Sequence, residues 1–437
     1  MTLDPSTSTV GHKRSSFERE FRLKDALSLV NEEYSRLGLK PYVVFEAPMS
    51  DKDPSYRILW MKVRDRLERD VAVGGGKGGG EQSFASALFE TYEHYALNTW
   101  EGYSQSFTLT EIARQPALAK HYLIQRMAAD FPSARLNCIR FETQFPGKIS
   151  LWFPLRMVSP NCYKLGAKGD DEAQVEAYFR YSSNSGCASG STRDEAILHG
   201  LLELIERDAG SLSVLEWFGS PKRTVPARIM RVKSLPEDLQ ALCGSLTELL
   251  EVNPVIIETT TDFGIPCAIA IPNQLLPESR VSALYGAGAS LSLGYAIERA
   301  LGELAQVCIT ARRRSVLVPD GLRRNDNDAD DLRRWPCIAA TAELDPQQIL
   351  SYAIDVEFRE TENSCAPVPK QVQSIVQVLA DKGYQAWLFD WTGEDSKVAV
   401  TSVLVPGLES FLIYAHSRHV VLPVGRGWDQ LAKAIPS

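Results

Sequence analysis

Pairs of carboxylates, spaced to share one face of a helix, follow runs of small residues at two places in the chain. In "GGGKGGGEQSFASALFETYEHY", Glu90 and Glu93 are three residues apart. In "ASGSTRDEAILHGLLELIERD", Glu203 and Glu206 repeat that spacing. Residues three or four apart are neighbours on a helix surface. Each stretch therefore predicts two carboxylates that point the same way.

Two further features resemble these pairs. Glu195 lies eleven residues before Glu206, which places it about 20° away around a helix of 3.6 residues per turn. In "YGAGASLSLGYAIERALGELAQ", Arg299 and Glu303 are four residues apart. Each helix taken alone is also compatible with a solvated face, because a charged face opposite an apolar stripe is typical of ordinary surface helices.

The combination indicates a nucleotide site. Carboxylates that converge in a pocket repel one another and raise their own pKa values unless cations compensate. Mg²⁺ prefers oxygen ligands and is usually held by a few carboxylates together with substrate phosphates. Small-residue loops and basic side chains supply donors for phosphate oxygens. A P-loop is excluded, because "GGGKGG" lacks the Ser or Thr that must follow its lysine.

The elements that must position these residues are helices and strands in a mixed α/β or α+β arrangement. Apolar spacing predicts a helix from Glu18 to Gly38, a second over 85–97 and a third from Thr192 to about Leu212. A glycine-rich turn is expected to precede the second helix. Strands are predicted over 57–63, 71–76, 149–155, 254–260, 265–272, 280–286, 384–391 and 397–405.

Composition narrows the class of protein. With 44% hydrophobic and 23% charged residues, the 437-residue chain resembles an ordinary globular protein. A net charge of −8 disfavours nucleic acid as a partner. The eight cysteines are scattered singly, which indicates reduced thiols in a cytoplasm. No stretch reaches the roughly 18 apolar residues of a membrane span, so a membrane location is not expected.

The chain resembles the YcaO family. The resemblance rests on "SALFETYEH", "ASGSTRDEAILHGLLELIERD", "GAGASLSLGYAIERALGELAQ" and "VLVPGLE", in that order, and spans about Lys24 to Trp428. It implies an ATP-binding fold with sheets and helices around a buried nucleotide site. Residues 1–16, rich in Ser, Thr and charge, are expected to form a flexible arm, followed by one YcaO domain over 17–437.

The resemblance also implies roles for individual residues. Glu90, Glu93, Glu203 and Glu206 match the magnesium ligands of the family. Nucleotide contacts are implied for Glu195, Arg207, Arg299 and Glu303, and the last three are expected to act in catalysis. Lys24 and Ser28 stand roughly where some members contact a phosphate. His94 and His199 are expected to be structural or surface residues, and Cys187 a small packing residue.

The activity implied is the ATP- and magnesium-dependent phosphorylation of a backbone amide oxygen in a ribosomally made precursor peptide. A Cys, Ser or Thr nucleophile then gives an azoline ring, sulfide gives a thioamide, and an amine gives an amidine. Many ring-forming members end in a PxPxP tail, whereas this chain ends in "LPVGRGWDQLAKAIPS". Ring formation is therefore only slightly ahead of thioamide formation.

The family resemblance also leads to expectations about partner proteins, and other classes of function remain as alternatives. A separate leader-peptide-binding or sulfur-delivery protein is expected, and a homodimer is left open. A nucleotide-binding accessory protein that docks a substrate for another enzyme is the main alternative, although it has no physical need for four convergent carboxylates. A metabolic ATP-dependent ligase is a third hypothesis, which small-molecule dependence of ATP turnover would distinguish.

Overall fold

The fold is seen in a computed structural model, which describes a defined part of the chain. The described residues are 16–51, 54–143, 149–160, 171–179, 182–219, 225–280, 284–317, 338–341, 345–361, 366–414, 418–422 and 425–427. Apart from its last residue, the arm expected over 1–16 lies outside them. No helix among these residues is both long enough and apolar enough to cross a membrane.

Four sheets are present in the described ranges, and most of their strand pairs are antiparallel. The first contains β1 (Lys40–Pro48), β2 (Tyr56–Arg64) and β3 (Asp70–Gly79) in that order. The second has the order β4 (Gln105–Thr108), β5 (Arg135–Glu142), β14 (Trp387–Asp390), β15 (Ala399–Leu404), β7 (Cys187–Gly190), with β6 (Ser150–Pro154) paired to β5.

The third sheet has the order β11 (Gly286–Ala289), β10 (Cys267–Pro272), β9 (Pro254–Glu258), β8 (Ala227–Met230), β13 (Ala353–Val356), and its β8–β13 pair is parallel. The fourth has the order β12 (Ile338–Thr341), β17 (Arg418–Leu422), β16 (Ser410–Tyr414). The mixed α/β prediction is therefore confirmed. The predicted strand over 280–286 is wrong in its placement: β11 begins only at Gly286, and Arg280 ends a short 3₁₀ helix, η6 (Pro277–Arg280).

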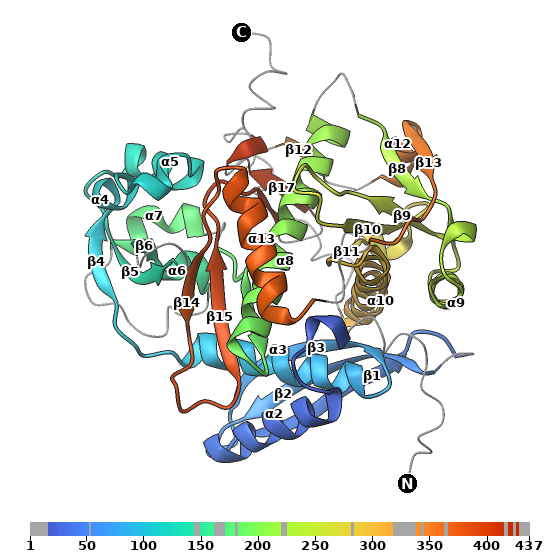
Figure 1. Cartoon of the computed structure of the whole chain (residues 1–437), viewed down its shortest axis with the longest axis horizontal. Helices are drawn as coiled ribbons and strands as arrows, with labels where there is room; N and C mark the ends of the chain where they lie inside the picture. Colours follow the sequence, from blue (N-terminus) through green and yellow to red (C-terminus); the bar gives the residue numbers. More distant parts are fainter. Residues whose placement is uncertain are drawn as a thin grey trace.

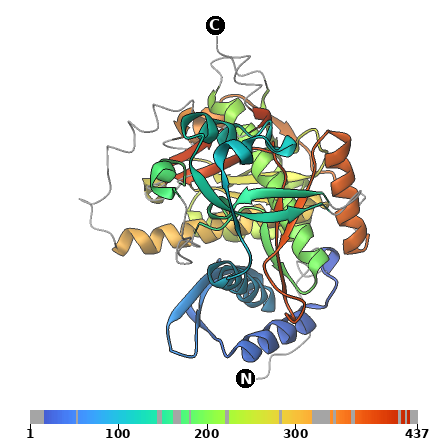
Figure 2. The same cartoon turned by 90° about the vertical axis from the view of Figure 1, so that its left-hand side faces the viewer.

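The longer helices are α2 (Leu23–Leu37), α3 (Glu81–Thr99), α8 (Arg193–Val214), α9 (Glu237–Leu250), α10 (Leu293–Leu317) and α13 (Val368–Asp381). Shorter ones are α4 (Leu109–Ala113), α5 (Tyr122–Asp130), α6 (Leu155–Val158), α7 (Glu172–Phe179) and α12 (Pro346–Leu350), with single turns at η1 (Ser16–Glu18), η2 (Pro116–Leu118), η4 (Leu215–Gly219) and η5 (Val232–Ser234). Figure 1 shows α3 lying against the first sheet, α8 crossing the middle of the molecule and α10 beside it. The first sheet with α2 and α3 forms one end of the molecule (Figure 2).

Local sequence explains the helix ends. Thr192 caps α8, and its side chain accepts a hydrogen bond from the Glu195 N–H. Gly38 ends α2 in the left-handed conformation at φ 70°, as glycine does most readily. The predicted start of that helix is wrong, however: Glu18 belongs to the separate turn η1, and α2 begins only at Leu23.

Each of the three runs of small residues contains a strand. The strand predicted over 71–76 is confirmed within Asp70–Gly79, whereas Cys187–Gly190 and most of Gly286–Ala289 are strands where the sequence suggested loops. These strands are β3, β7 and β11. Among the described strands, each lies at one end of its sheet and directly precedes a helix: α3, α8 or α10. The small residues let strand and helix backbones approach closely. A Cβ placed on Gly76 would lie 2.0 Å from the Ser83 carbonyl oxygen, and one on Gly286 would lie 2.1 Å from that of Ala300. Larger residues would push each helix off its strand.

The hydrophobic core fixes how these helices face the site. On α8, Ile197, Leu201 and Ile205 are fully buried in a core shared with α13 and β15. The opposite face carries Glu195 and Glu206, which are also buried, at 3% and 6% exposed. The polar face of α8 is therefore not a solvated surface, and it must face a polar interior site.

Candidate nucleotide and magnesium site

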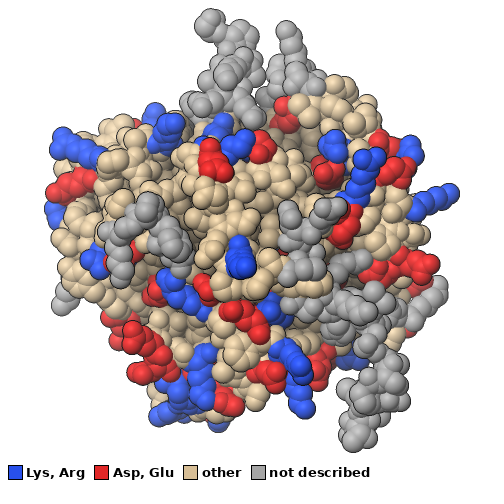
Figure 3. All heavy atoms as spheres, viewed as in Figure 1, with Lys and Arg blue, Asp and Glu red and all other residues tan. Residues whose placement is uncertain are grey.

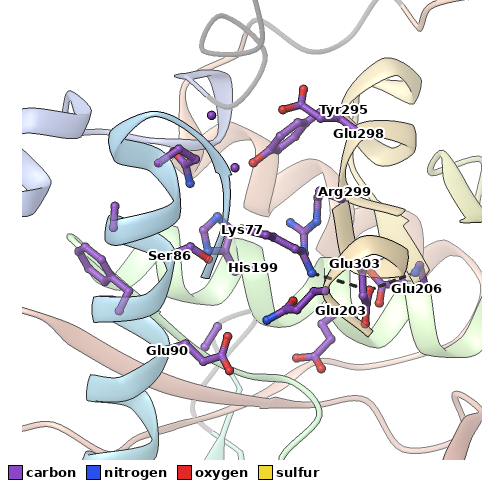
Figure 4. A pocket seen from close by; sticks show the side chains of 18 of the residues that line it. Lys77, Ser86, Glu90, His199, Glu203, Glu206, Tyr295, Glu298, Arg299 and Glu303 are labelled. Atoms are coloured by element: carbon purple, nitrogen blue, oxygen red, sulfur yellow. Dashed lines mark hydrogen bonds and ion pairs between the residues drawn. The ribbon is translucent and has the colours of Figure 1, made fainter. Parts of the chain in front are cut away.

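A cavity of about 920 Å³ lies where α3, α8 and α10 converge. Eight of the predicted site residues line it: Glu90 and Glu93 from α3, Glu195, Glu203, Glu206 and Arg207 from α8, and Arg299 and Glu303 from α10. Figure 4 shows Glu90, Glu203 and Glu303 arranged around the same space. The structure thus brings together residues that are up to 213 positions apart in the sequence.

The same local arrangement occurs three times around the cavity. In each case a glutamate on the helix accepts a hydrogen bond from a backbone N–H in or next to the preceding strand: Gly75 to Glu90 at 3.1 Å, Gly186 to Glu203 at 3.2 Å and Ala287 to Glu303 at 3.0 Å. A backbone donor orients each carboxylate and leaves its other lone pairs for a ligand. Three strand–helix units therefore contribute one anchored carboxylate each.

One end of the cavity is acidic. Burial raises the pKa of Glu90 above its ordinary value. Burial, together with the charges of Glu203 and Glu90, raises the pKa of Glu93 further. Glu206 lies between this end and Glu303, and it also has a raised pKa, about 7, because of burial and of the neighbouring Glu303 carboxylate. The positive charge near these carboxylates is too small to offset burial and mutual repulsion, so their pKa values stay above the ordinary carboxylate value.

The other end carries cations. Lys77 Nζ lies 4.0 Å from Glu303 Oε2, and Arg207 Nη2 lies 3.5 Å from Glu203 Oε1. Burial acts to raise the pKa of Glu303, but the charges of Lys77 and Arg207 outweigh it and leave this pKa below its ordinary value. Burial works against protonation of Arg299, yet Glu206 and other anions raise its pKa. This end is prepared to meet phosphate oxygens.

The donor set fits magnesium that arrives together with a nucleotide. Across the described ranges, no three Asp, Glu, His or Cys side chains are close enough together to hold a metal ion by themselves. Mg²⁺ usually takes one or two carboxylates and fills its remaining positions with water and phosphate oxygens. Anchored carboxylates contributed by three helices around one cavity suit that mode of binding.

Two of the predicted nucleotide contacts lie elsewhere. Lys24 and Ser28 are exposed on α2 and do not line the cavity; the Ser28 hydroxyl donates to Glu32 at 3.4 Å. Because α2 starts only at Leu23, the cavity instead receives Arg19 from the segment before the helix. The Arg19 guanidinium donates to Gln82 Oε1 at 3.2 Å.

Glu195 has a clear structural task at the same edge. Its carboxylate accepts hydrogen bonds from the Ser191 N–H at 2.8 Å, from the Phe21 N–H at 3.3 Å and from the Glu20 N–H. It thereby fixes the segment that carries Arg19 into the cavity. The sequence gives no signal for this contact, since it depends on long-range packing between the chain start and α8.

Other lining residues were missed or undervalued. Lys77 lies inside a glycine run that resembled a turn, although a lysine amid glycines in a strand could have signalled a ligand-facing position. His199 lines the cavity, and burial with the nearby Arg299 and Arg19 lowers its pKa to about 3, so its imidazole is neutral. Burial, and then Glu93, raises the pKa of Cys187 well above the ordinary thiol value, which argues against a thiolate nucleophile.

Comparison with known proteins decides the family. A family model described as YcaO cyclodehydratase, ATP- and Mg²⁺-binding, matches residues 75–409. The chain belongs to the YcaO family. All the metal ligands implied by the sequence resemblance fall inside the matched range, and the YcaO family binds ATP and Mg²⁺, as expected.

Solved structures show the same fold. YcaO from Methanopyrus kandleri, bound with AMPPCP and Mg²⁺, matches with a TM-score of 0.61 and 19% identity, over 89% of this chain and 92% of that one. A heterocyclase in complex with substrate and cofactor matches with a TM-score of 0.60 and 18% identity, over 92% of this chain and 54% of that one. The E. coli microcin synthetase McbBCD complex matches with a TM-score of 0.53 and 14% identity, over 81% and 85%. At these identities the likeness concerns the fold alone.

Proposed function

We propose that this YcaO protein phosphorylates backbone amide oxygens of a ribosomally made precursor peptide, and that the activated amides close to azoline rings. The observation that carries the proposal is the division of one cavity into an acidic end, at Glu90 and Glu93, and a cationic end, at Lys77, Arg207 and Arg299. Such a division suits a magnesium-bound triphosphate, whose transferred phosphoryl group needs charge compensation and positioning.

The residues would divide the work as follows. Glu90, Glu93, Glu203 and Glu206 would hold magnesium, and bound Mg²⁺–ATP supplies the phosphoryl group. Arg207 and Arg299 would neutralise charge on that group, and Glu303, fixed by the Ala287 N–H, would hold Lys77 and Arg207 in place. Glu195 on α8 would hold the N-terminal segment in place, and Arg19 of that segment would close the edge of the site. The chemistry then needs no nucleophile from the enzyme itself.

Thioamide or amidine formation would use the same activation with a different nucleophile. Ring formation is preferred because the matched family model is described as a cyclodehydratase. We also propose a separate partner protein that binds the leader peptide or delivers sulfur, since the similar McbBCD is described as a complex. A purely accessory, docking role is disfavoured: three glutamates whose pKa values are raised by partial or full burial are costly for a protein that performs no chemistry.

Isotope transfer tests this function directly. A peptide that binds the protein would be synthesised with ¹⁸O in its amide carbonyls and incubated with the protein, ATP and Mg²⁺. The proposal expects ¹⁸O in the released phosphate, because the amide oxygen leaves on phosphorus. Loss of one water from the peptide would identify an azoline, and exchange of oxygen for sulfur a thioamide. Phosphate free of ¹⁸O during peptide-dependent turnover would contradict amide activation.

A further inference from the structure

A second cavity adjoins the first. It measures about 390 Å³ and shares two lining residues, His94 and Asn184, with the larger one. Its walls are the first half of β3, including Val71 and Val73, and the end of α3, including Leu97 and Asn98. A cavity above about 300 Å³ is in the size range of ligand sites.

The two cavities meet at the acidic end of the nucleotide site. His94 follows Glu93 on α3 and lies one helical turn beyond Glu90, so the junction borders two of the proposed magnesium ligands. The cationic end, with Lys77 and Arg299, lies across the larger cavity (Figure 4). In phosphoryl transfer the attacking and leaving oxygens lie roughly in line. An amide oxygen must therefore reach the phosphoryl group from the side that the rest of the nucleotide does not fill.

The lining suits a neutral extended backbone. Lys62 and Asp70 both line the cavity and pair with each other at 2.8 Å, so their charges cancel. Asn98 and Asn184 carry carboxamides, which can both donate and accept hydrogen bonds, as a peptide backbone does. The surface of the molecule likewise shows acidic and basic groups interspersed on the face in view (Figure 3). An anionic ligand would find no concentrated positive charge in this second cavity.

Apolar and polar groups are combined here as in peptide grooves. Val73 lies on β3, the end strand of its sheet among the described strands, and its side chain is 44% exposed. Its carbonyl accepts a hydrogen bond from His94 Nδ1 at 2.5 Å, because a carbonyl cannot donate. An end strand with an exposed apolar side chain is a common place for an extended peptide to bind.

We infer that the cavity formed by Val71, Val73, His94, Leu97, Asn98 and Asn184 binds an extended segment of the peptide substrate beside the amide that is activated. The inference rests on the proposed function. It assigns the nucleotide to the larger cavity and the peptide to the smaller one, with the reacting amide at their junction. Specificity for residues next to the modified position would then reside in β3 and the end of α3.

Selection from a random peptide library tests this site without knowledge of the natural substrate. A displayed library of random dodecapeptides would be selected on the full-length protein with Mg²⁺ and AMPPCP, and the enriched pool would be bound to variants. Val73→Arg and Asn98→Arg each place a long side chain into the cavity. Binding of the pool is expected to fall about tenfold or more in both.

The matched control is Val44→Arg on β1. Val44 is 38% exposed, close to the exposure of Val73, but it lines neither cavity. This variant is expected to bind the pool like the wild type, and all three variants are expected to bind ATP unchanged. The inference would be overturned if Val73→Arg and Asn98→Arg bound the pool as tightly as the wild type does. It would also be overturned if no peptides were enriched on a wild-type protein that binds ATP. Absence of ATP binding by the wild type would instead contradict the proposed function.

Discussion

Glu93 on α3 and Glu303 on α10 both line one cavity and are only partly exposed, and each accepts a hydrogen bond from a strand backbone, that of Ser189 or of Ala287. Their pKa values nevertheless shift in opposite directions. Glu93 faces Glu203 and Glu90, and its pKa is raised. Glu303 faces Lys77, Arg207 and Arg299, and its pKa is lowered. Burial is common to both, so the neighbouring charges decide the difference. The end that lacks cations is where a metal ion would stabilise the protein most.

The largest effect is expected from Glu206→Gln, which removes a proposed magnesium ligand between the two ends. ATP turnover should fall by about 100-fold or more, because a preorganised electrostatic contact acts strongly in a buried site. Phosphate release measures this, and circular dichroism checks that the fold is intact. Glu237→Gln, at an exposed position on α9, is the control. Full activity of Glu206→Gln would remove the metal assignment.

Lys77→Met should remove the contrast between the two ends. Without this cation the pKa of Glu303 is expected to rise, since the Lys77 charge, with Arg207, keeps it low. Turnover should fall by about 10- to 100-fold, while Lys77→Arg should retain part of the activity. Lys233→Met, on the exposed turn η5, should behave like the wild type. Unchanged turnover in Lys77→Met would show that Lys77 does not contribute to phosphoryl transfer, which would leave this role to Arg207 and Arg299.

Binding of ATP with magnesium should weaken on acidification. Glu206 has a pKa of about 7, so it is increasingly protonated below that pH and loses its ability to bind a cation. Affinity is expected to drop by up to about tenfold per pH unit between pH 7 and pH 6, and to level off above pH 8. Calorimetry at a series of pH values measures this. The dependence should be smaller in Glu206→Gln; an identical profile there would assign it to another group.

The smallest effect distinguishes two residues of the N-terminal region. Arg19 lines the cavity, whereas Lys24 is exposed on α2. Arg19→Ala should weaken ATP binding about threefold to tenfold, because it removes one charged contact at the edge of the site. Lys24→Ala serves as the matched control and should bind like the wild type. The reverse ranking would restore the original sequence assignment.

Much of the site could be predicted because its charged residues occur in short motifs, each within a single helix. The spacing of Glu90 with Glu93, and of Glu203 with Glu206, fixes which side chains share a helix face before any fold is known. The boundaries of α8 and the strands β9, β10 and β15 also agree with the apolar pattern. Local periodicity was sufficient wherever one helix or strand determined the outcome.

The rest depends on contacts between distant segments. Glycine runs resemble turns in a single sequence, so β3 was predicted only over 71–76 and the strand expected over 280–286 was misplaced relative to β11. The close approach of α3 and α10 explains why the glycines of β3 and β11 continue as strands. Arg19 was missed for Lys24 because the start of α2 depends on the contacts that Glu195 makes with the preceding backbone. The second cavity forms between β3, α3 and residues near 159 and 184, so no motif could announce it.

The central claim is that the acidic end of the cavity binds ATP through magnesium. Calorimetric titration of ATP into the purified protein, with and without Mg²⁺, tests it most directly, beside the variant Glu203→Gln/Glu206→Gln. The account predicts magnesium-dependent binding by the wild type and its loss in the variant. Equal binding by the two folded proteins, or binding that ignores magnesium, would contradict it.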